Sequence, residues 1–536
     1  KKELQKKLPA YMVPSCFMDI ERVPLTANGK IDKRSLPLPT ENDFIDDAIY
    51  VEPSSILEKQ LANIWKEVLG ISSLSINSSL FDLGGSSISI AKIINKIKSE
   101  TEFVVAFKDV FENPTIKGII PFLTQNTQNV EIPIATKQDY YPITSAQLRF
   151  WLLCQMPEVN RAYNIPFTIK LEGGLNKELL ARAFHSLIER HEILRTSFVQ
   201  DSEGEIKQEI LSINSINFNL EILELFKDED LNDKISEFNS QEFDLAKAPL
   251  IKARIISTAE SCFYLSIIAH HIVFDGHSLK VLIKELSTIY NNLLVSLKPQ
   301  LPDLKIQFKD YAIWNNDVSL NNATKQHEFW MNELSGELPI INIPTYQNRP
   351  QIQTFKGDNL SYVLKNELLR DVNKFSKSQK TTDFTVLLAA LKGLLYRYTN
   401  QTDIIIGTPV LGRDHKDLED QIGLYINTIP IRTRFDKSDD FYQLVDNQKN
   451  TLSRAYANSG YSFGDILNGL KLHRDTSRPP VFDVLVIYQK QNENDIKFNK
   501  LFDGVNCKAY NEVDSFVSKY DITFSFLEFE GQLSIN

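Results

Sequence analysis

The stretch His270-His271-Ile272-Val273-Phe274-Asp275-Gly276 carries the side chains best suited to acid and base chemistry in this chain. Imidazole titrates near neutral pH, so His271 is a candidate for accepting or holding a proton. Asp275 is a candidate anchoring carboxylate, and Gly276 leaves room for a substrate to pass. The alternative interpretation is a pair of core histidines followed by an Asp-Gly turn.

A serine that follows two glycines is the second candidate. In Phe81-Asp82-Leu83-Gly84-Gly85-Ser86-Ser87-Ile88 the glycines can adopt backbone angles that other residues avoid. We expect Ser87 to cap the following helix, with its hydroxyl exposed beside unpaired backbone N–H groups. A phosphodiester on that hydroxyl would lie at the positive end of the helix dipole. An ordinary N-cap serine is the alternative.

Hydrophobic periodicity indicates the elements that position both candidates. An apolar run over 262–269 predicts a buried strand before His270, and apolar residues at helical spacing over 279–289 predict a helix after Gly276. His271 is therefore expected on a strand-to-helix loop, where side chains are both held and accessible. Upstream, the same spacing predicts a bundle of four short helices in about 75 residues. These helices lie near 57–68, 87–97, 107–111 and 116–123.

Length and composition exclude several classes of protein. A chain of 536 residues is long enough for two or more cores. The net charge of -10 has no basic block, which argues against a nucleic-acid or membrane partner, and no apolar run is long enough for a span. Four widely spaced cysteines without a CxxC pair predict no metal site and a reducing, cytoplasmic location. The start lacks Met and a signal peptide, so we expect a piece of a longer protein.

The Ser87 and His271 patterns together resemble the peptidyl carrier and condensation domains of non-ribosomal peptide synthetases. The resemblance to the condensation domain covers about residues 138 to 536 and rests on five further motifs in family order. These motifs are Thr144–Trp151, Arg190–Phe198, Phe308–Trp314, Ile422–Thr428 and Arg474–Pro479.

This resemblance implies a multidomain chain. We expect an all-α, four-helix carrier domain and then an α/β condensation domain with two lobes, each like chloramphenicol acetyltransferase. The predicted boundaries are a linker over 41–49, the carrier over 50–125, a second linker over 126–138 and the condensation domain over 139–536. Its N-lobe is expected over about 139–310 and its C-lobe over about 311–536, with the active site between the lobes.

Residues 1–40 are similar to the C-terminal end of an adenylation domain, through Leu8–Pro14 and Asn28–Asp32. In that family the lysine at the position of Lys30 contacts the carboxylate and phosphate during adenylate formation. The phosphate loop and the amino-acid pocket of that domain are missing, so Lys30 is expected to be an inactive orphan here.

The resemblance also implies an activity, namely amide bond formation on carrier-bound thioesters. Ser87 would carry 4'-phosphopantetheine and the donor acyl group, while an amine on a downstream carrier attacks. His271 would position that amine or accept its proton, and His270 would give packing support. Asp275 and Arg195 are expected to form a structural ion pair, and Asn427 to support the site. The implied partners are an upstream adenylation core, a downstream aminoacyl carrier and a phosphopantetheinyl transferase.

Two departures and several alternatives accompany this interpretation. Family carriers usually have His or Asp where Ser86 stands, and the segment 458–463 lacks the family's usual His/Asp stretch. An epimerization domain, a heterocyclization domain and a recruitment module without catalysis are the alternatives within the family. The last is expected to lose the histidine pair. Gly460–Gly464 also matches the nucleophile elbow of hydrolases, but a helix rather than a strand is expected before it.

Overall fold

The computed structural model describes residues 50–536 apart from 126–130, 157–158, 227–228, 299, 347, 473–474, 491–497, 499–500, 512–516 and 530. The expected adenylation remnant over 1–40, with Lys30, and the first linker over 41–49 lie outside the described residues. Within the described part of the chain, no helix is both long and apolar enough to cross a membrane.

The N-terminal part of the described chain is a small helical bundle with its own core. Its fully buried side chains include Trp65, Ile90 and Phe111. Ser55 and Glu58 form a capping box at the start of the first helix, as expected for a polar residue followed three positions later by Glu. The helices are α2 (Ile56–Leu69), α3 (Ser87–Glu100), α4 (Phe107–Glu112) and α5 (Ile116–Ile119), and the short strands β1 (Phe103–Val104) and β2 (Thr124–Gln125) pair with each other.

The first lobe of the larger part is built on a five-stranded sheet in the order β14-β4-β9-β8-β7. Its strands are β4 (Asn164–Gly173), β7 (Leu220–Glu224), β8 (Ile251–Ala259), β9 (Cys262–His270) and β14 (Val505–Ala509). Its helices are α6 (Ser145–Leu153), α7 (Val159–Ala162), α8 (Lys177–Arg190), α9 (Leu231–Asn239) and α10 (Gly276–Leu294). A separate sheet joins β3 (Tyr140–Pro142), β6 (Ile206–Ile210) and β5 (Thr196–Gln200). Strand β14 comes from the range predicted for the C-lobe, so that range contributes a strand to the N-lobe sheet.

The second lobe has a six-stranded sheet in the order β10-β16-β15-β13-β11-β12. Its strands are β10 (Tyr362–Leu364), β11 (Asp403–Val410), β12 (Asn427–Arg434), β13 (Val484–Lys490), β15 (Ile522–Phe529) and β16 (Gln532–Ile535). Its helices are α11 (Phe308–Glu333), α12 (Asn366–Ser378), α13 (Asp383–Thr399), α14 (Phe441–Ala457) and α15 (Phe463–Leu470). Helix α11 begins in the last residues predicted for the N-lobe.

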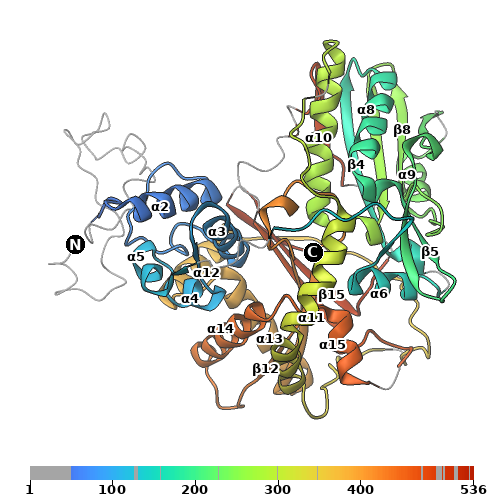
Figure 1. The fold of residues 1–536 in the computed structure, drawn as a ribbon. Helices are drawn as coiled ribbons and strands as arrows, with labels where there is room; N and C mark the ends of the chain where they lie inside the picture. The colour runs from blue at the N-terminus through green and yellow to red at the C-terminus, as the bar shows by residue number, and fades with distance from the viewer. Residues whose placement is uncertain are drawn as a thin grey trace, which may run out of the picture.

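The helical bundle lies against the second lobe, beside α12 and α14 (Figure 1). The rings of Phe107 and Tyr456 meet with centroids 5.1 Å apart, and the Asn95 side chain donates to the Arg413 carbonyl at 2.8 Å. Ile132, inside the predicted second linker, is buried in the core of the first lobe. The described end of that segment is therefore packed against the lobe that follows it.

Candidate functional site

His271 lies on the loop between β9 and α10, the kind of position that the sequence predicts. Strand β9 ends at His270, a single 3-10 turn spans His271–Val273, and α10 starts at Gly276. The His271 amide donates to the Tyr163 carbonyl at 2.9 Å. The loop is also held from the first predicted motif, because the buried Gln147 side chain donates to the Ile272 carbonyl at 3.3 Å. Two other elements thus fix the histidine backbone.

The His271 ring is packed between aromatic side chains, although part of the residue stays accessible. It stacks on Phe150 with centroids 4.9 Å apart and meets Tyr163 edge-on at 6.5 Å. Burial, reinforced by the charge of Lys519, lowers the pKa of His271 to about 3. The imidazole is therefore neutral at pH 7, so it can hydrogen-bond an incoming amine but has little affinity for a proton in this state.

His270 is packed beneath the same loop. Its ring is fully buried, and its Nδ1 accepts a hydrogen bond from the Ile272 amide at 3.2 Å. Its Nε2 lies 3.4 Å from the Cys154 sulfur, and Phe243 packs against the ring edge-on. Burial lowers the pKa of His270 to about 3. The side chain thus supports the loop as a neutral group.

Asp275 forms a buried ion pair, but the predicted partner was wrong. Arg413 Nη2 lies 3.1 Å from the Asp275 carboxylate, and both side chains are almost fully buried. The carboxylate also accepts from the amide and hydroxyl of Ser278, both at 2.7 Å, and from the Tyr425 amide at 3.1 Å. Burial by itself raises the pKa of Asp275, yet Arg413 and these donors bring that pKa below its usual value.

Arg195 lies elsewhere, in the second motif. Its guanidinium donates to the Leu211 carbonyl at 2.6 Å and meets Glu192 at 3.4 Å. It steadies the start of β5 and does not anchor the histidine loop. Arg413 escaped the sequence reasoning because it stands 138 residues from Asp275, in no motif that was singled out. The available hint was that a buried carboxylate requires a cation somewhere in the chain.

The motifs that are separate in sequence converge on this loop. The Ser278 hydroxyl accepts from the Gly423 amide at 3.0 Å, which ties α10 to the fourth motif. In the second motif, His191 Nε2 lies 2.7 Å from Glu285 of α10. The second and fourth motifs thus have the same role, because both hold α10 and the loop before it in place.

Asn427 holds the loop before α15. Its amide donates to the Ser459 and Tyr461 carbonyls at 2.9 and 2.8 Å, and its oxygen accepts from the Phe463 amide at 3.0 Å. This loop is the segment that departs from the family pattern. Its Ser462 caps α15 by accepting from the Asp465 amide, and helix α14 precedes it, so the hydrolase elbow is excluded.

Gly276 opens onto free space. A Cβ placed on this residue would meet no atom of the described chain within 4 Å, and the residue is exposed. Beside it, the His277 ring donates from Nε2 to the Glu419 carbonyl at 2.9 Å. Burial first, then the charge of Arg413, lowers the pKa of His277 to about 4, with a smaller effect from Lys92. Because Lys92 belongs to α3, the carrier-like bundle lies close to this opening.

Lys519 is a further residue near the histidines that the sequence reasoning missed. Its ammonium lies 4.8 Å from the centre of the Tyr163 ring. Burial and the neighbouring charge of Arg149 lower its pKa to about 8. No local pattern marks this lysine, because it reaches the site from the segment before β15, far along the chain.

The serine turn has the geometry expected for a group attached at a helix start, with one correction. Gly84 has a φ of +85°, and a Cβ on Gly85 would lie 2.6 Å from the Leu80 side chain, so both positions require glycine. The helix cap is Ser86 and not Ser87: the Ser86 hydroxyl accepts from the Ser89 amide, and Ser87 is the first helical residue. Ser89 makes a reciprocal cap with Ser86 possible. Helix propensity alone does not predict this cap. Because Ser87 is the first residue of α3, an anion attached there would lie at the positive end of the helix dipole, which fits a phosphopantetheine arm.

The chain matches two family profiles. The condensation domain profile matches residues 137–536, and the phosphopantetheine attachment site profile matches residues 59–123. The chain is 36% identical to gramicidin S synthase 2 of Brevibacillus brevis, over 99% of this chain and 12% of that protein. It is also 33% identical to bacitracin synthase 3 of Bacillus licheniformis, over 99% of this chain and 8% of that protein. The chain therefore spans about an eighth or less of the length of these relatives.

Solved structures agree on the fold. The X-domain from teicoplanin biosynthesis superposes with a TM-score of 0.68 at 25% identity, covering 76% of this chain and 91% of the other. The first condensation domain of the CDA synthetase gives a TM-score of 0.60 at 16% identity, covering 74% and 92%. The predicted fold class, a helical carrier followed by a two-lobed, chloramphenicol acetyltransferase-like α/β domain, is confirmed. With a profile match over three quarters of its length and the loop of His271 at the junction of its motifs, this chain belongs to the condensation domain family and carries a phosphopantetheine attachment domain ahead of it.

Proposed function

We propose that this chain is the carrier and condensation part of a peptide synthetase module, and that it forms an amide bond between two carrier-bound substrates. Ser87 holds the donor, and His271 serves the attacking amine. The observation that carries the proposal is the coexistence of both sites in one chain, with α3 of the carrier packed close to the opening at Gly276. The boundaries of the two domains are proposed as 50–125 and 139–536.

The chain's own residues divide the work. Phosphopantetheine, when bound, supplies the thiol that carries the acyl group as a thioester. Gly84 and Gly85 shape the turn that presents Ser87, and Gly276 leaves the passage open. His271, neutral because it is buried, accepts a hydrogen bond from the amine and orients its lone pair toward the carbonyl carbon. Amine attack and loss of the thiolate leave an amide, and the proton from the amine leaves with the thiol.

Positioning supplies the larger part of the rate in this proposal. A general base contributes about 10² to 10⁴, and a histidine with a pKa of about 3 is a weak one. Two aligned reactants reach effective molarities of about 10⁵ to 10⁸ M. The rigid loop, held by Gln147, Tyr163 and the Asp275–Arg413 pair, suits the second task.

The partners and location belong to the same proposal. An adenylation core upstream would load the carrier, a phosphopantetheinyl transferase would modify Ser87, and a downstream carrier would bring the acceptor. A reducing cytoplasm is supported by the free thiols of Cys154, Cys262 and Cys507. Recruitment without catalysis is the second candidate, because one structural neighbour, the X-domain, was solved in a complex with OxyB. Retention of the histidine pair in a packed, anchored loop favours the enzyme.

The test uses the whole chain. Ser87 is loaded from an acyl coenzyme A by a phosphopantetheinyl transferase, an aminoacyl carrier is supplied in trans, and intact masses are followed. We expect loading to be lost in Ser87→Ala, and the amide to accumulate on the added carrier. His271→Ala should load normally and condense at least about tenfold more slowly. Product that stays on Ser87, or loading that persists in Ser87→Ala, would overturn the assignment.

A further inference from the structure

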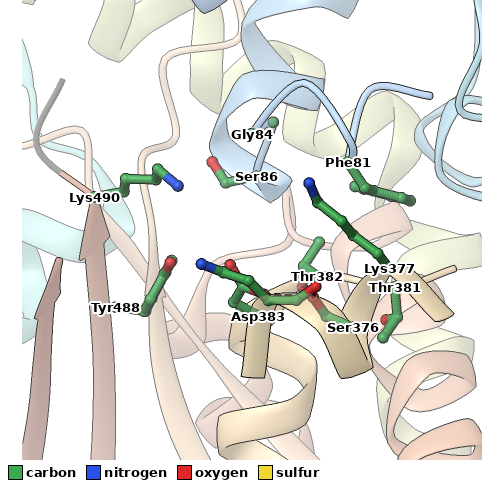
Figure 2. A pocket seen from close by; sticks show the side chains of 12 residues that line it. Phe81, Gly84, Ser86, Ser376, Lys377, Thr381, Thr382, Asp383, Tyr488 and Lys490 are labelled. Atoms are coloured by element: carbon green, nitrogen blue, oxygen red, sulfur yellow. Dashed lines mark hydrogen bonds between the residues drawn. The ribbon is translucent and has the colours of Figure 1, made fainter. Parts of the chain in front are cut away.

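A pocket lies where the serine turn of the carrier meets the second lobe of the condensation domain (Figure 2). It has a volume of about 100 Å³ and is walled on one side by Gly84, Gly85 and Ser86. The opposite wall is formed by the junction of α12 and α13 and by the end of β13. The mechanism proposed above makes no use of this pocket, although the residue expected to carry phosphopantetheine directly follows one of its walls.

Two lysines of the second lobe point toward the serine turn across this pocket. Figure 2 shows Lys377 and Lys490 with their ammonium groups directed at the loop that holds Gly84 and Ser86. Lys377 donates one hydrogen bond to the Asp82 carbonyl at 3.3 Å. Lys490 pairs with Glu528 at 2.7 Å, and its ammonium lies 3.9 Å from the Cβ position of Gly84. An ammonium has three donors, so each lysine keeps donors for another acceptor.

Thr381 is an independent sign that the pocket is a binding site. Its side chain lines the pocket and is almost fully buried, at 1% exposure. Its hydroxyl has no hydrogen-bond partner among the residues that the structure describes. Buried hydroxyls are nearly always paired, because leaving one unpaired costs about 1 to 3 kcal/mol. An acceptor oxygen placed in the pocket would satisfy it.

The two acidic groups nearby already have partners of their own. Asp383 lines the pocket, but its carboxyl already accepts from the Ser376 hydroxyl at 2.5 Å, and burial raises its pKa. Glu528 is satisfied by Lys490 and by the Tyr488 hydroxyl, which donates to it at 2.6 Å. Glu528 offsets the charge of Lys490, while the hydrogen bond of Lys377 goes to a neutral carbonyl, that of Asp82. The spare ammonium donors of the two lysines match a ligand with several acceptor oxygens.

We propose that Lys377, Lys490 and Thr381 bind the phosphodiester of the phosphopantetheine arm on Ser87 when the carrier is docked on the second lobe. A phosphodiester offers several acceptor oxygens to these donors, and the two ammonium groups favour its negative charge. This inference rests on the proposed attachment at Ser87. The inference goes beyond that attachment, because docking of the carrier then depends on the arm: the condensation domain holds a loaded carrier more tightly than an unmodified one.

The 14-residue helix α3 strengthens the match, because the positive end of its dipole lies at the serine turn. Tethering also matters. A group attached to the wall of the pocket is present at a high effective concentration, so modest contacts suffice to bind it. Because Lys377 is exposed, binding is expected to weaken as added salt screens the charges.

Hydrogen–deuterium exchange on the full chain tests the proposal. Loading with phosphopantetheine is first verified by intact mass, so a failure at Ser87 is recognised separately from a failure of the pocket. We expect amides over 377–385 and 484–490 to exchange about threefold more slowly in the loaded protein, the size of effect that partly exposed charge contacts give. Sodium chloride at about 0.5 M should remove most of this difference.

Matched variants assign the effect. Lys377→Gln and Thr381→Val should each reduce the difference between loaded and unmodified protein, and Lys377→Gln is at an exposed position where folding is safe. Thr381→Val should leave the unmodified protein as stable as before, because no hydrogen bond is lost. Lys374→Gln, an exposed lysine of α12 that does not line the pocket, is the control and should behave like the parent.

Three exchange results with the loaded protein and its variants would overturn the proposal, as would a fourth with added phosphate. They are a verified load without slower exchange, an equal difference in Lys377→Gln and the parent, and a loss in Lys374→Gln as large as in Lys377→Gln. Inorganic phosphate at about 10 mM, added to the unmodified protein as an untethered source of the same chemistry, is expected to have little effect because it lacks the effective concentration of the arm. Protection by phosphate as large as that given by the arm would assign the pocket to a free anion and refute the arm as its ligand.

Discussion

The pairing of Asp275 with Arg413 leads to a prediction that separates the observed anchor from the one the sequence suggested. Replacing Arg413 by Ala removes the guanidinium that faces Asp275 at 3.1 Å and stacks 4.1 Å above the Tyr425 ring. It also removes donors to the Leu418 and Gln421 carbonyls. The carboxylate is left buried with no cation beside it.

The expected cost follows from that burial. The Arg413 and Asp275 side chains are 4% and 2% exposed, so solvent screens them little. Removing one partner of such a pair costs about 3 to 5 kcal/mol. This is a large share of the roughly 5 to 15 kcal/mol typical of a folded domain. Arg195→Ala should cost about 1 kcal/mol or less, because its pair with Glu192 is partly exposed.

Urea unfolding of the parent, the two arginine variants and the cycle of Asp275→Asn with Arg413→Met measures these contributions. We expect the double variant to recover part of the loss, with a coupling energy of about 0.5 to 3 kcal/mol. Condensation activity should fall with Arg413→Ala even below its unfolding transition, since the loop loses its anchor. A larger loss in Arg195→Ala than in Arg413→Ala, or no coupling in the cycle, would refute the reasoning.

Three further predictions concern the same site. Gly276→Ala should leave activity and melting temperature unchanged, because its Cβ meets nothing within 4 Å, while Gly276→Trp should block condensation without lowering the melting temperature; an active Trp variant contradicts the passage. Asn427→Ala should cost about 2 kcal/mol in urea unfolding, because it leaves two carbonyls and an amide without partners. His270 has a folded pKa of about 3 against 6.5, so its unfolded form binds the proton first and stability is lost as pH falls from 6.5 toward 3. The share of His270 in this loss of stability is about 2 kcal/mol between about pH 6.5 and 5. In His270→Asn, which keeps a hydrogen-bond acceptor, the free energy of unfolding should fall less steeply as the pH is lowered; an unchanged slope contradicts the assignment.

The local elements were predictable because their signals are local. The apolar run over 262–269 indicated strand β9, and the helical spacing after Gly276 indicated α10, with bounds that differ by a few residues. The four helices of the carrier followed from the same periodicity. The face of a strand or helix on which a side chain lies follows from its spacing to near neighbours in the sequence. Hydrophobic periodicity is therefore enough to predict these elements.

The cap at the serine turn shows where local reasoning stops. Ser86 and Ser87 are both good cap residues, and the sequence could not rank them. The choice depends on which hydroxyl can reach the Ser89 amide once Gly84 and Gly85 have turned the chain. A shift of one residue would change which serine caps the helix, and only the path of the backbone decides between the two serines.

The sequence by itself determined the family, the order of the two domains, the histidine loop and the serine that follows the glycines. Only the tertiary structure decided that Arg413 anchors Asp275, that Lys519 lies near His271, and that β14 crosses into the first lobe. The physical reason is distance along the chain. Buried charges and sheet edges must find partners, but packing selects those partners among residues hundreds of positions away, and no short-range pattern records that selection.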